Sequence, residues 1–250
     1  VEVYAVDVEK FVDLIRGVEL FILDQVPLEK GYSFGINYLD GKKVMRYIND
    51  VPGGSILKKY DRVQDIIFSL HAVRERYSGL FSLEFVEELF KFSKTNMMPQ
   101  EAYSLGKLLV GKGTLSCTIL PCEIDDAGNY RLDEISHKIY EKEFLTSLVK
   151  EEESVGSIKV KILNGTDIPG YARKMRNLLI REGLNVVEFG TSPYPKLGYS
   201  ILINQRGNLI NTRKTSEITG IKHIHHVIDN SQLHDVLIIL GKDSTKGEEE

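Results

Sequence analysis

The sequence predicts an α/β protein with a large N-terminal α/β unit at residues 1–150 and a smaller C-terminal α/β domain at residues 157–243. Short apolar runs of strand length alternate with segments whose apolar residues recur at helical spacing, as in α/β folds. The composition changes at Glu151–Gly156, where consecutive glutamates and a glycine interrupt that alternation. Beyond this break we expect two strand–helix–strand halves, and the polar residues 244–250 are predicted to form a disordered tail.

Composition and charge restrict the classes of function. The 250 residues are 42% hydrophobic and 27% charged, which is ordinary for a globular protein. The net charge of −4 argues against a nucleic-acid partner, because such surfaces gather Lys and Arg to displace counterions. No apolar run is as long as a membrane span. Because the chain begins at Val1 with a strand already leading into a helix, we expect that an N-terminal part of the native protein precedes it.

The elements of the N-terminal unit follow from turn residues and from apolar spacing. Asp7 can cap a first helix that ends at Gly17, because Asp accepts from the free N–H groups at a helix start and glycine favours a helix end. The expected elements, in order, are a strand over 3–6, this helix, a strand over 17–23, a turn at 39–41, a helix over 83–92, a helix over 100–110, a strand over 115–120, a turn over 125–129 and a helix over 135–148.

Residues 47–64 carry most of the functional argument. A short apolar strand is expected to end at Asn49, and a Pro-Gly-Gly turn follows at 52–54, where glycine lets the backbone bend and approach a ligand. Asp61 can cap an amphipathic helix after this turn. The residues expected on the buried face of that helix are Val63, Ile66, Ile67, Leu70 and Val73.

Basic residues gather at the junction between this turn and the helix. Lys58, Lys59 and Arg62 would combine positive charge with the free N–H groups of a helix start, an arrangement that suits an anion such as a phosphate. The alternative is a surface loop with solvated lysines.

The C-terminal domain is expected to begin with a strand that has one wet face, because Ile158, Val160 and Ile162 alternate with lysines. A turn follows at 164–166, and Asp167 can cap the next helix. The turn could also hold an anion at the helix start, but turn and capping chemistry explains it equally well. The elements expected after it are a helix ending at Gly183, a strand from Val186, a strand over 199–203, a helix over 208–219 and a strand over 236–240.

Cysteines and histidines are weak signals for chemistry in this chain. An extended path between Cys117 and Cys122 would span roughly 16–18 Å, too far for a disulfide, so we expect free thiols. His223, His225 and His226 could form a metal site with a fourth histidine at 234, but a solvent-facing strand or loop explains them as well.

Short motifs follow one another in a specific order along most of the chain. In the first half they lie at 4–7, 11–18, 39–41, 47–48, 54, 62, 66–67, 95–96 and 130–133. In the second half they are Val160–Thr166, Gly170–Ala172 and Val236–Asp243. This order resembles the LytR–CpsA–Psr (LCP) family of cell-envelope proteins, together with the LytR C-terminal domain that is often appended to it.

The resemblance implies a fold and an activity. Residues 1–150 would be the later part of an LCP α/β sandwich, in a protein that is extracytoplasmic and membrane-anchored when intact. Its activity would be phosphotransfer of a glycopolymer from a polyprenyl-pyrophosphate carrier onto peptidoglycan, which relies on positioning and charge stabilisation. Mg²⁺ is the cofactor that the resemblance alone suggests. The residues that the resemblance points to are Arg62 and Lys59 as catalytic and Asn49, Lys58, Ile66, Ile67 and Leu70 as substrate-binding, with no metal ligand assigned.

The chain departs from the family pattern at this site. Asn49 stands where the family has an arginine, and Ser55 and Ile56 stand where it has an aspartate. Lys59 replaces another arginine and Val63 a glutamine. Lysine keeps the charge but loses the bidentate fork of arginine, so the exchange weakens a phosphate site. We therefore expect impaired catalysis.

Three functions stay open: a transferase of the LCP type seen as a fragment, a catalytically weakened relative that binds polyprenyl lipid or glycan, and a non-catalytic protein-interaction module. Direct DNA binding is discounted, because Arg173, Lys174 and Arg176 are too few on one face to form a recognition surface.

Overall fold

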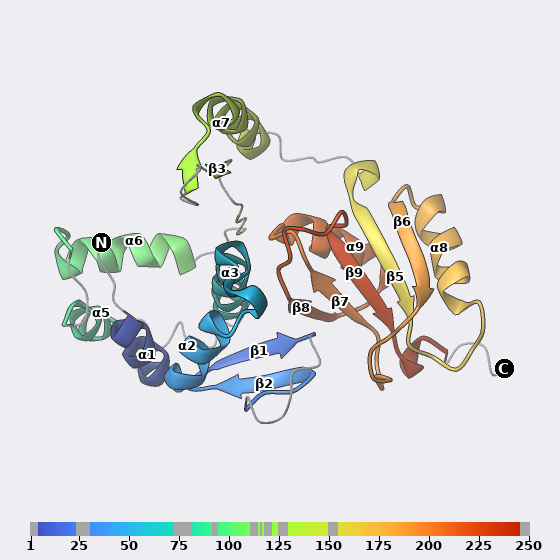
Figure 1. Cartoon of the computed structure of the whole chain (residues 1–250), viewed down its shortest axis with the longest axis horizontal. Coiled ribbons are helices and arrows are strands. Elements are labelled where there is room, and N and C mark those ends of the chain that lie inside the picture. Colours follow the sequence, from blue (N-terminus) through green and yellow to red (C-terminus); the bar gives the residue numbers. More distant parts are fainter. Residues whose placement is uncertain are drawn as a thin grey trace.

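The computed structural model describes residues 5–23, 31–72, 82–91, 95–110, 115, 117, 122–124, 130–149 and 155–245. Figure 1 shows an N-terminal lobe of helices around a two-stranded ribbon and a C-terminal domain around a larger sheet. We call residues 5–72 the N-terminal lobe and residues 155–245 the C-terminal domain. Both combine helices with strands, so the predicted α/β class is confirmed.

The N-terminal lobe packs three helices against an antiparallel ribbon. Asp40 caps one of them by accepting from the backbone N–H of Lys43 at 2.8 Å. The first residue of that helix, Gly41, lies against the backbone of α1, and an added Cβ would stand 2.2 Å from the carbonyl oxygen of Glu9. The elements are α1 (Ala5–Leu14), β1 (Val18–Ile22), β2 (Gly35–Leu39), α2 (Gly41–Asn49), the short turn η2 (Pro52–Gly54) and α3 (Ile56–Ala72).

The C-terminal domain is a five-stranded mixed sheet in the order β6-β5-β9-β7-β8. The units β5-α8-β6 and β7-α9-β8 each join parallel strands, which confirms the two predicted strand–helix–strand halves. Strand β9 lies between them, parallel to β5 and antiparallel to β7. The elements are η3 (Val155–Ser157), β5 (Lys159–Asn164), α8 (Tyr171–Arg181), β6 (Asn185–Thr191), β7 (Ile201–Asn204), α9 (Leu209–Thr219), β8 (His223–His226), β9 (Val236–Leu240) and η4 (Lys242–Thr245).

The two faces of this sheet have different covers. Helices α8 and α9 pack on the face that carries Val160, Ile162 and Ile238. The N-terminal lobe covers the opposite face, where Phe21 and Leu23 join a core with Leu163, Ile201, Ile203, Leu237 and Ile239. The predicted wet face of β5 is present at Lys159, which is exposed, but it does not extend to Leu163, which is only 6% exposed. The lobes share a hydrophobic core across this face.

The helices beyond α3 occur where the apolar spacing predicted them. They are α5 (Leu83–Phe90), α6 (Pro99–Val110) and α7 (Glu134–Val149), and the small hairpin β3 (Cys122–Ile124) and β4 (Tyr130–Leu132) precedes the last of them. In Figure 1, α7 lies apart from the two lobes, and Ile135 on this helix is 74% exposed. Most of the predicted strand at 115–120, the turn at 125–129 and residues 246–250 of the tail lie outside the described residues.

Several predicted boundaries in the N-terminal lobe are wrong. Ala5 and Val6 belong to α1 and not to a strand, so Asp7 lies inside the helix. The segment predicted as a strand ending at Asn49 is the last turn of α2, and β2 was not predicted. Helix α3 begins five residues before Asp61, so that carboxylate is not its cap. In each case the local pattern was too short to separate a strand from one turn of helix.

The predicted cap of α8 is also wrong. The helix begins at Tyr171, and its N-cap is Gly170, which has a φ of 77° that favours glycine. Asp167 instead forms an ion pair with Lys196. The cap of α9 agrees with the predicted start, since Asn208 accepts from the backbone N–H groups of Ile210 and Asn211.

Candidate functional site

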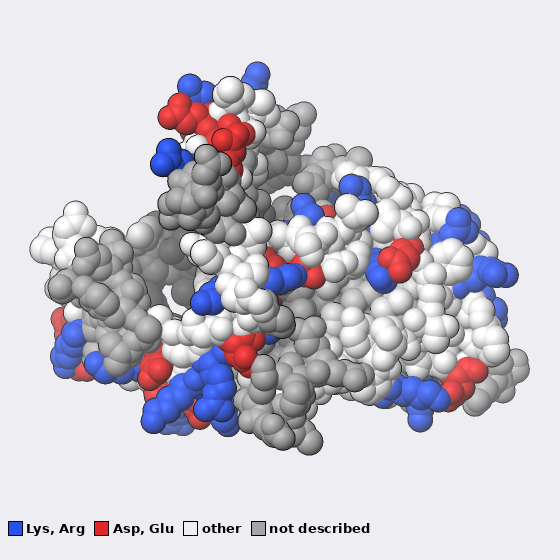
Figure 2. Space-filling view, in the orientation of Figure 1, with Lys and Arg blue, Asp and Glu red and all other residues white. Residues whose placement is uncertain are grey.

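Helix α3 presents the predicted basic residues to the C-terminal domain, but not all of them. Lys58, Asp61, Arg62 and Asp65 recur at helical spacing and line a cleft between the lobes. Lys59 lies outside the lining of this cleft. A larger group of positive charges on the N-terminal lobe lies away from this cleft. Figure 2 shows Lys and Arg side chains gathered over α2.

Arg62 is bound to the end of the neighbouring helix. Its Nη1 donates to the carbonyl oxygen of Tyr47 and, at 2.9 Å, to that of Asp50. The guanidinium carbon also lies 4.6 Å from the centre of the Tyr47 ring. The last carbonyls of a helix lack partners within it, and Arg62 supplies a donor to two carbonyls at the end of α2.

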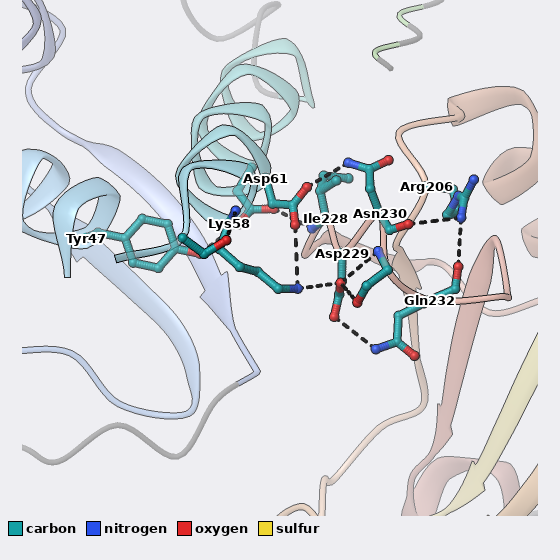
Figure 3. Close-up of polar contacts among 11 residues, drawn as sticks. Tyr47, Lys58, Asp61, Arg206, Ile228, Asp229, Asn230 and Gln232 are labelled. Atoms are coloured by element: carbon teal, nitrogen blue, oxygen red, sulfur yellow. Dashed lines mark hydrogen bonds and ion pairs between the residues drawn. The ribbon is translucent and has the colours of Figure 1, made fainter. Parts of the chain in front are cut away.

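Lys58 joins the two lobes through carboxylates. Its Nζ forms an ion pair with Asp229 of the C-terminal domain and lies 3.5 Å from Asp61 (Figure 3). Asp229 also accepts from the side-chain amide of Gln232 at 2.9 Å. Partial burial by itself would raise the pKa of Asp229, but the bonds from Lys58, Ser231 and Gln232 outweigh it and hold that pKa at about 2.

Asp65 is a buried carboxyl that links α2, α3 and the C-terminal domain. The Tyr47 hydroxyl donates to it at 2.7 Å, and the backbone N–H of Ile228 donates to its other oxygen. Burial raises the pKa of Asp65 to about 8, although both hydrogen bonds act in the opposite direction. The neutral form therefore predominates at pH 7. Asp61, one turn earlier, accepts from the side chain of Asn230 at 2.7 Å, as Figure 3 shows.

The interlobe cleft has a volume of about 690 Å³ and draws its lining from both lobes. Its ionisable lining is balanced, because three cations (Lys58, Arg62 and Lys161) meet the carboxylates of Asp61, Glu188 and Asp229, besides Asp65. The 227–235 loop between β8 and β9 forms its far side, and Arg206 holds that loop by donating to the backbone oxygens of Asn230 at 3.2 Å and Gln232 at 2.7 Å (Figure 3). The cleft is thus lined by charged groups whose formal charges nearly cancel.

The structure does not bring the predicted binding residues together. Asn49 is exposed and donates to the carbonyl of Met45 at 2.9 Å. Ile66 is buried in the core of the N-terminal lobe and Leu70 packs against that core, whereas Ile67 is 41% exposed. Of the predicted set, only Lys58 and Arg62 line the cleft. The predicted catalytic and binding roles themselves stay predictions.

The Mg²⁺ that the resemblance suggests stays a prediction. In the part of the chain that the structure describes, no group of three or more His, Cys, Asp or Glu side chains could hold a metal ion. Asp61 and Asp229, the carboxylates nearest the predicted site, already share the ammonium of Lys58. The two cysteines, Cys117 and Cys122, are free, as predicted.

The histidines of β8 pack between the lobes. The ring of His225 stacks on Phe21 of β1 at 4.4 Å between centres, and the ring of His226 on Phe68 of α3 at 5.4 Å. The expected strand is confirmed, but its predicted exposure is wrong for His226, which is 5% exposed. Their spacing pointed to chemistry, whereas their role in the fold is contact between lobes.

The sequence did not point to Gln205, and it pointed to His234 only as a possible metal ligand and not as a residue of this cleft. Gln205 follows β7 and His234 precedes β9, and both are buried at the cleft. Each is a single polar residue beside an apolar strand, and such a residue is ordinary turn chemistry in a sequence. Of the described helices, none has both the length and the apolar character needed to cross a membrane.

Three solved structures resemble the chain at low identity. The soluble domain of a conserved hypothetical secreted protein from Mycobacterium marinum has a TM-score of 0.32 and 15% identity, over 39% of this chain and 68% of that one. TagV from B. subtilis has a TM-score of 0.43 and 15% identity, over 60% and 63%. The Lin1025 protein from Listeria innocua has a TM-score of 0.38 and 13% identity, over 58% and 66%. The chain thus spans just under two thirds of the length of TagV and of Lin1025. The identities and TM-scores of all three structures are too low to transfer a function.

A family model gives the more specific likeness. No curated protein matches the chain. Residues 157–243 match the family described as LytR cell envelope-related transcriptional attenuator, and these residues coincide with the five-stranded domain. The C-terminal domain is therefore a LytR-type domain, which links the chain to proteins of the cell envelope.

Proposed function

We propose that this is a cell-envelope protein of the LCP type, extracytoplasmic and membrane-anchored when intact, which binds a polyprenyl-(pyro)phosphate-linked glycopolymer without transferring it to peptidoglycan. The observation that carries this proposal is the interlobe cleft. It joins the part of α3 that resembles the LCP motif to a LytR-type domain, and both supply its lining. A cleft of about 690 Å³ is within the range of small-molecule sites, about 300–1,000 Å³.

Arg62 and Lys58 are already bound to groups of the protein, which favours binding of the glycopolymer over its transfer. Phosphoryl transfer needs cations aimed at the charge that develops on the phosphates. Here Arg62 is bound to two backbone carbonyls, and Lys58 to Asp229 and Asp61. Redirecting either would remove a hydrogen bond or an ion pair from these buried or partly buried partners, which costs free energy.

Transfer is the second candidate. Lys58 and Lys59 lie in the first turn of α3, where free N–H groups and the helix dipole attract anions. Under this alternative a phosphate would displace Asp229 from Lys58.

The two candidates separate in one assay. Purified lipid-linked wall glycopolymer in detergent micelles is offered to the full chain with peptidoglycan, and both retained polymer and released polyprenyl phosphate are measured. We expect saturable retention and no release. Release with polymer joined to peptidoglycan would establish transfer instead, and absence of retention would overturn both.

A matched pair of variants on β6 locates the binding. Thr191→Trp places a large ring at the cleft, whereas Val187→Trp does so at a position of the same strand that does not line it. We expect the first to weaken retention at least tenfold and the second to leave it unchanged. Equal affinities for both variants would place binding outside the cleft.

A further inference from the structure

We propose that the interlobe cleft holds a neutral, hydroxyl-rich sugar residue, hydrogen-bonded by Gln205 and His234 of the C-terminal domain. This inference rests on the proposed function in taking the wall glycopolymer as the source of the sugar. It adds the part of the ligand that is recognised and the residues that recognise it.

Two polar atoms at the cleft have no partner within the protein. Oε1 of Gln205 and Nε2 of His234 accept or donate no hydrogen bond in the described structure, and both side chains are 4% exposed. A buried polar atom without a partner costs about 1–3 kcal/mol, so such atoms are rare. Both residues line the same cleft, which is large enough to supply the missing partners.

The backbone around Gln205 holds this residue in place. Its N–H donates to the carbonyl of Asp235 at 2.9 Å, and its carbonyl accepts from the N–H of Asp229 at 3.0 Å. The backbone of Gln205 is therefore fixed between β7 and the 227–235 loop. Preorganisation of this kind favours affinity.

The two unpartnered atoms select the chemistry of the ligand. An amide oxygen only accepts, so Gln205 requires a donor. Burial lowers the pKa of His234 to about 4, so its ring is neutral at pH 7 and Nε2 pairs with a group that can accept or donate. A hydroxyl meets both requirements. An ionised phosphodiester or pyrophosphate offers acceptors only and would also face Asp61, Glu188 and Asp229.

The rest of the cleft suits the carbon skeleton of a sugar. Leu163 and Leu237 of the sheet form part of an apolar wall. The ring of Tyr194 lines the cleft too, and stacks on Phe34 of the N-terminal lobe at 5.7 Å between centres. Apolar walls with a few placed polar groups are typical of ligand sites. The three lining cations are balanced by the carboxylates of Asp61, Glu188 and Asp229. This balance favours a neutral ligand.

The test uses the full chain and two probes, the neutral disaccharide N,N′-diacetylchitobiose and inorganic pyrophosphate. NMR spectra of protein labelled in Gln amides and His rings report the two proposed contacts directly. We expect the disaccharide to shift the Gln205 amide and His234 ring signals saturably, and pyrophosphate to leave them in place. Shifts with pyrophosphate alone would overturn the inference.

Variants separate ligand binding from folding. Gln205→Leu removes the acceptor at the cleft, and Asn211→Leu removes an equally unpartnered amide oxygen on α9, a residue that does not line the cleft. We expect the first to weaken disaccharide binding about tenfold, the equivalent of one hydrogen bond, and the second to leave it unchanged. Equal affinity of wild type and Gln205→Leu would overturn the inference. His234→Phe supplies the same test if Gln205→Leu does not fold.

The proposed function and the sugar site fail in different ways. If lipid-linked glycopolymer is retained but the disaccharide shifts neither residue, the sugar site is wrong and the proposed function stands. If the disaccharide binds through Gln205 while glycopolymer is not retained, the site stands and the proposed function is wrong.

Discussion

Arg62 shows how one side chain can match a motif and yet serve the fold. The LCP resemblance assigns it to a phosphate, but its guanidinium is bound to the carbonyls of Tyr47 and Asp50 and lies on the Tyr47 ring. Both carbonyls accept from the same terminal nitrogen, Nη1, while the delocalised guanidinium also contacts the ring, a combination that suits arginine better than lysine. The local role of Arg62 is therefore to hold α3 to the end of α2.

Arg62→Lys should destabilise the protein by about 1–2 kcal/mol, because one carbonyl bond and the ring contact are lost. Urea unfolding of the variant measures the change. Arg213→Lys, at an exposed position of α9, is the control and should change stability by less than about 0.5 kcal/mol. Unchanged stability of Arg62→Lys with weaker glycopolymer binding would return Arg62 to the role that the family resemblance implies.

Strand β8 contacts the N-terminal lobe through two histidines, and their burial favours the neutral form of each ring. Burial is the main cause that lowers the pKa of both His225 and His226 from 6.5 to about 4. Each ring stacks on a phenylalanine of the N-terminal lobe. Because the folded state disfavours their protonation, their contribution to stability is complete above about pH 6.5 and is lost as the pH falls towards 4.

This strand should therefore make the protein sensitive to acid. Between pH 6.5 and 4, the two histidines should lower the free energy of unfolding by up to about 2.7 kcal/mol per pH unit, or about 1.4 for each proton. His225→Phe keeps a ring against Phe21 and should remove about 1.4 kcal/mol per pH unit from the slope measured by urea unfolding at several pH values. His234, whose pKa burial also lowers to about 4, adds to the slope, and Asp65 acts oppositely because its raised pKa makes stability fall as the pH rises from 3.8 to about 8. Both groups are common to the wild type and the variant.

The control for the acid slope lies on the same strand. Ile224→Val removes one methylene and no ionisable group, so it should leave the dependence of stability on pH as it is in the wild type. Identical slopes for wild type and His225→Phe would show that His225 does not titrate with unfolding.

At the scale of the molecule, the two lobes share one core. Phe21 and Leu23 from the N-terminal lobe pack on the sheet face of Ile201, Ile203 and Leu237. Without this cover, the LytR-type domain would expose a row of residues that are now almost fully buried. The cleft exists only while the lobes are docked, because both contribute to its lining.

Unfolding of the lobes should therefore be coupled. Phe21→Ala should lower the free energy of unfolding by about 3–5 kcal/mol and speed hydrogen exchange of β7 and β9, although Phe21 belongs to the other lobe. Ile36→Ala, at the position opposite Phe21 on β2, is 47% exposed in the wild type and should have a much smaller effect. Two separate calorimetric transitions, with that of the C-terminal domain unchanged in Phe21→Ala, would contradict this coupling.

Elements with long or strongly periodic patterns could be predicted from the sequence. Strand β9 is a continuous apolar run, and α9 has Asn208 at its start and Gly220 at its end, so their positions follow from local physics. Strand β2 could not be predicted in this way. Its apolar residues Ile36 and Tyr38 are largely exposed, so it lacks the pattern of a buried strand.

The sequence by itself determined the α/β class, the two strand–helix–strand halves of the C-terminal domain and the concentration of positive charge at the start of α3. Only the tertiary structure decided what those charges contact. Lys58 meets Asp229 across 171 residues, and Asp65 meets Ile228 across 163. Local propensity carries no information about such distant partners, because their pairing depends on how the apolar faces of two lobes pack. That packing turned a predicted anion site into one side of a nearly neutral cleft.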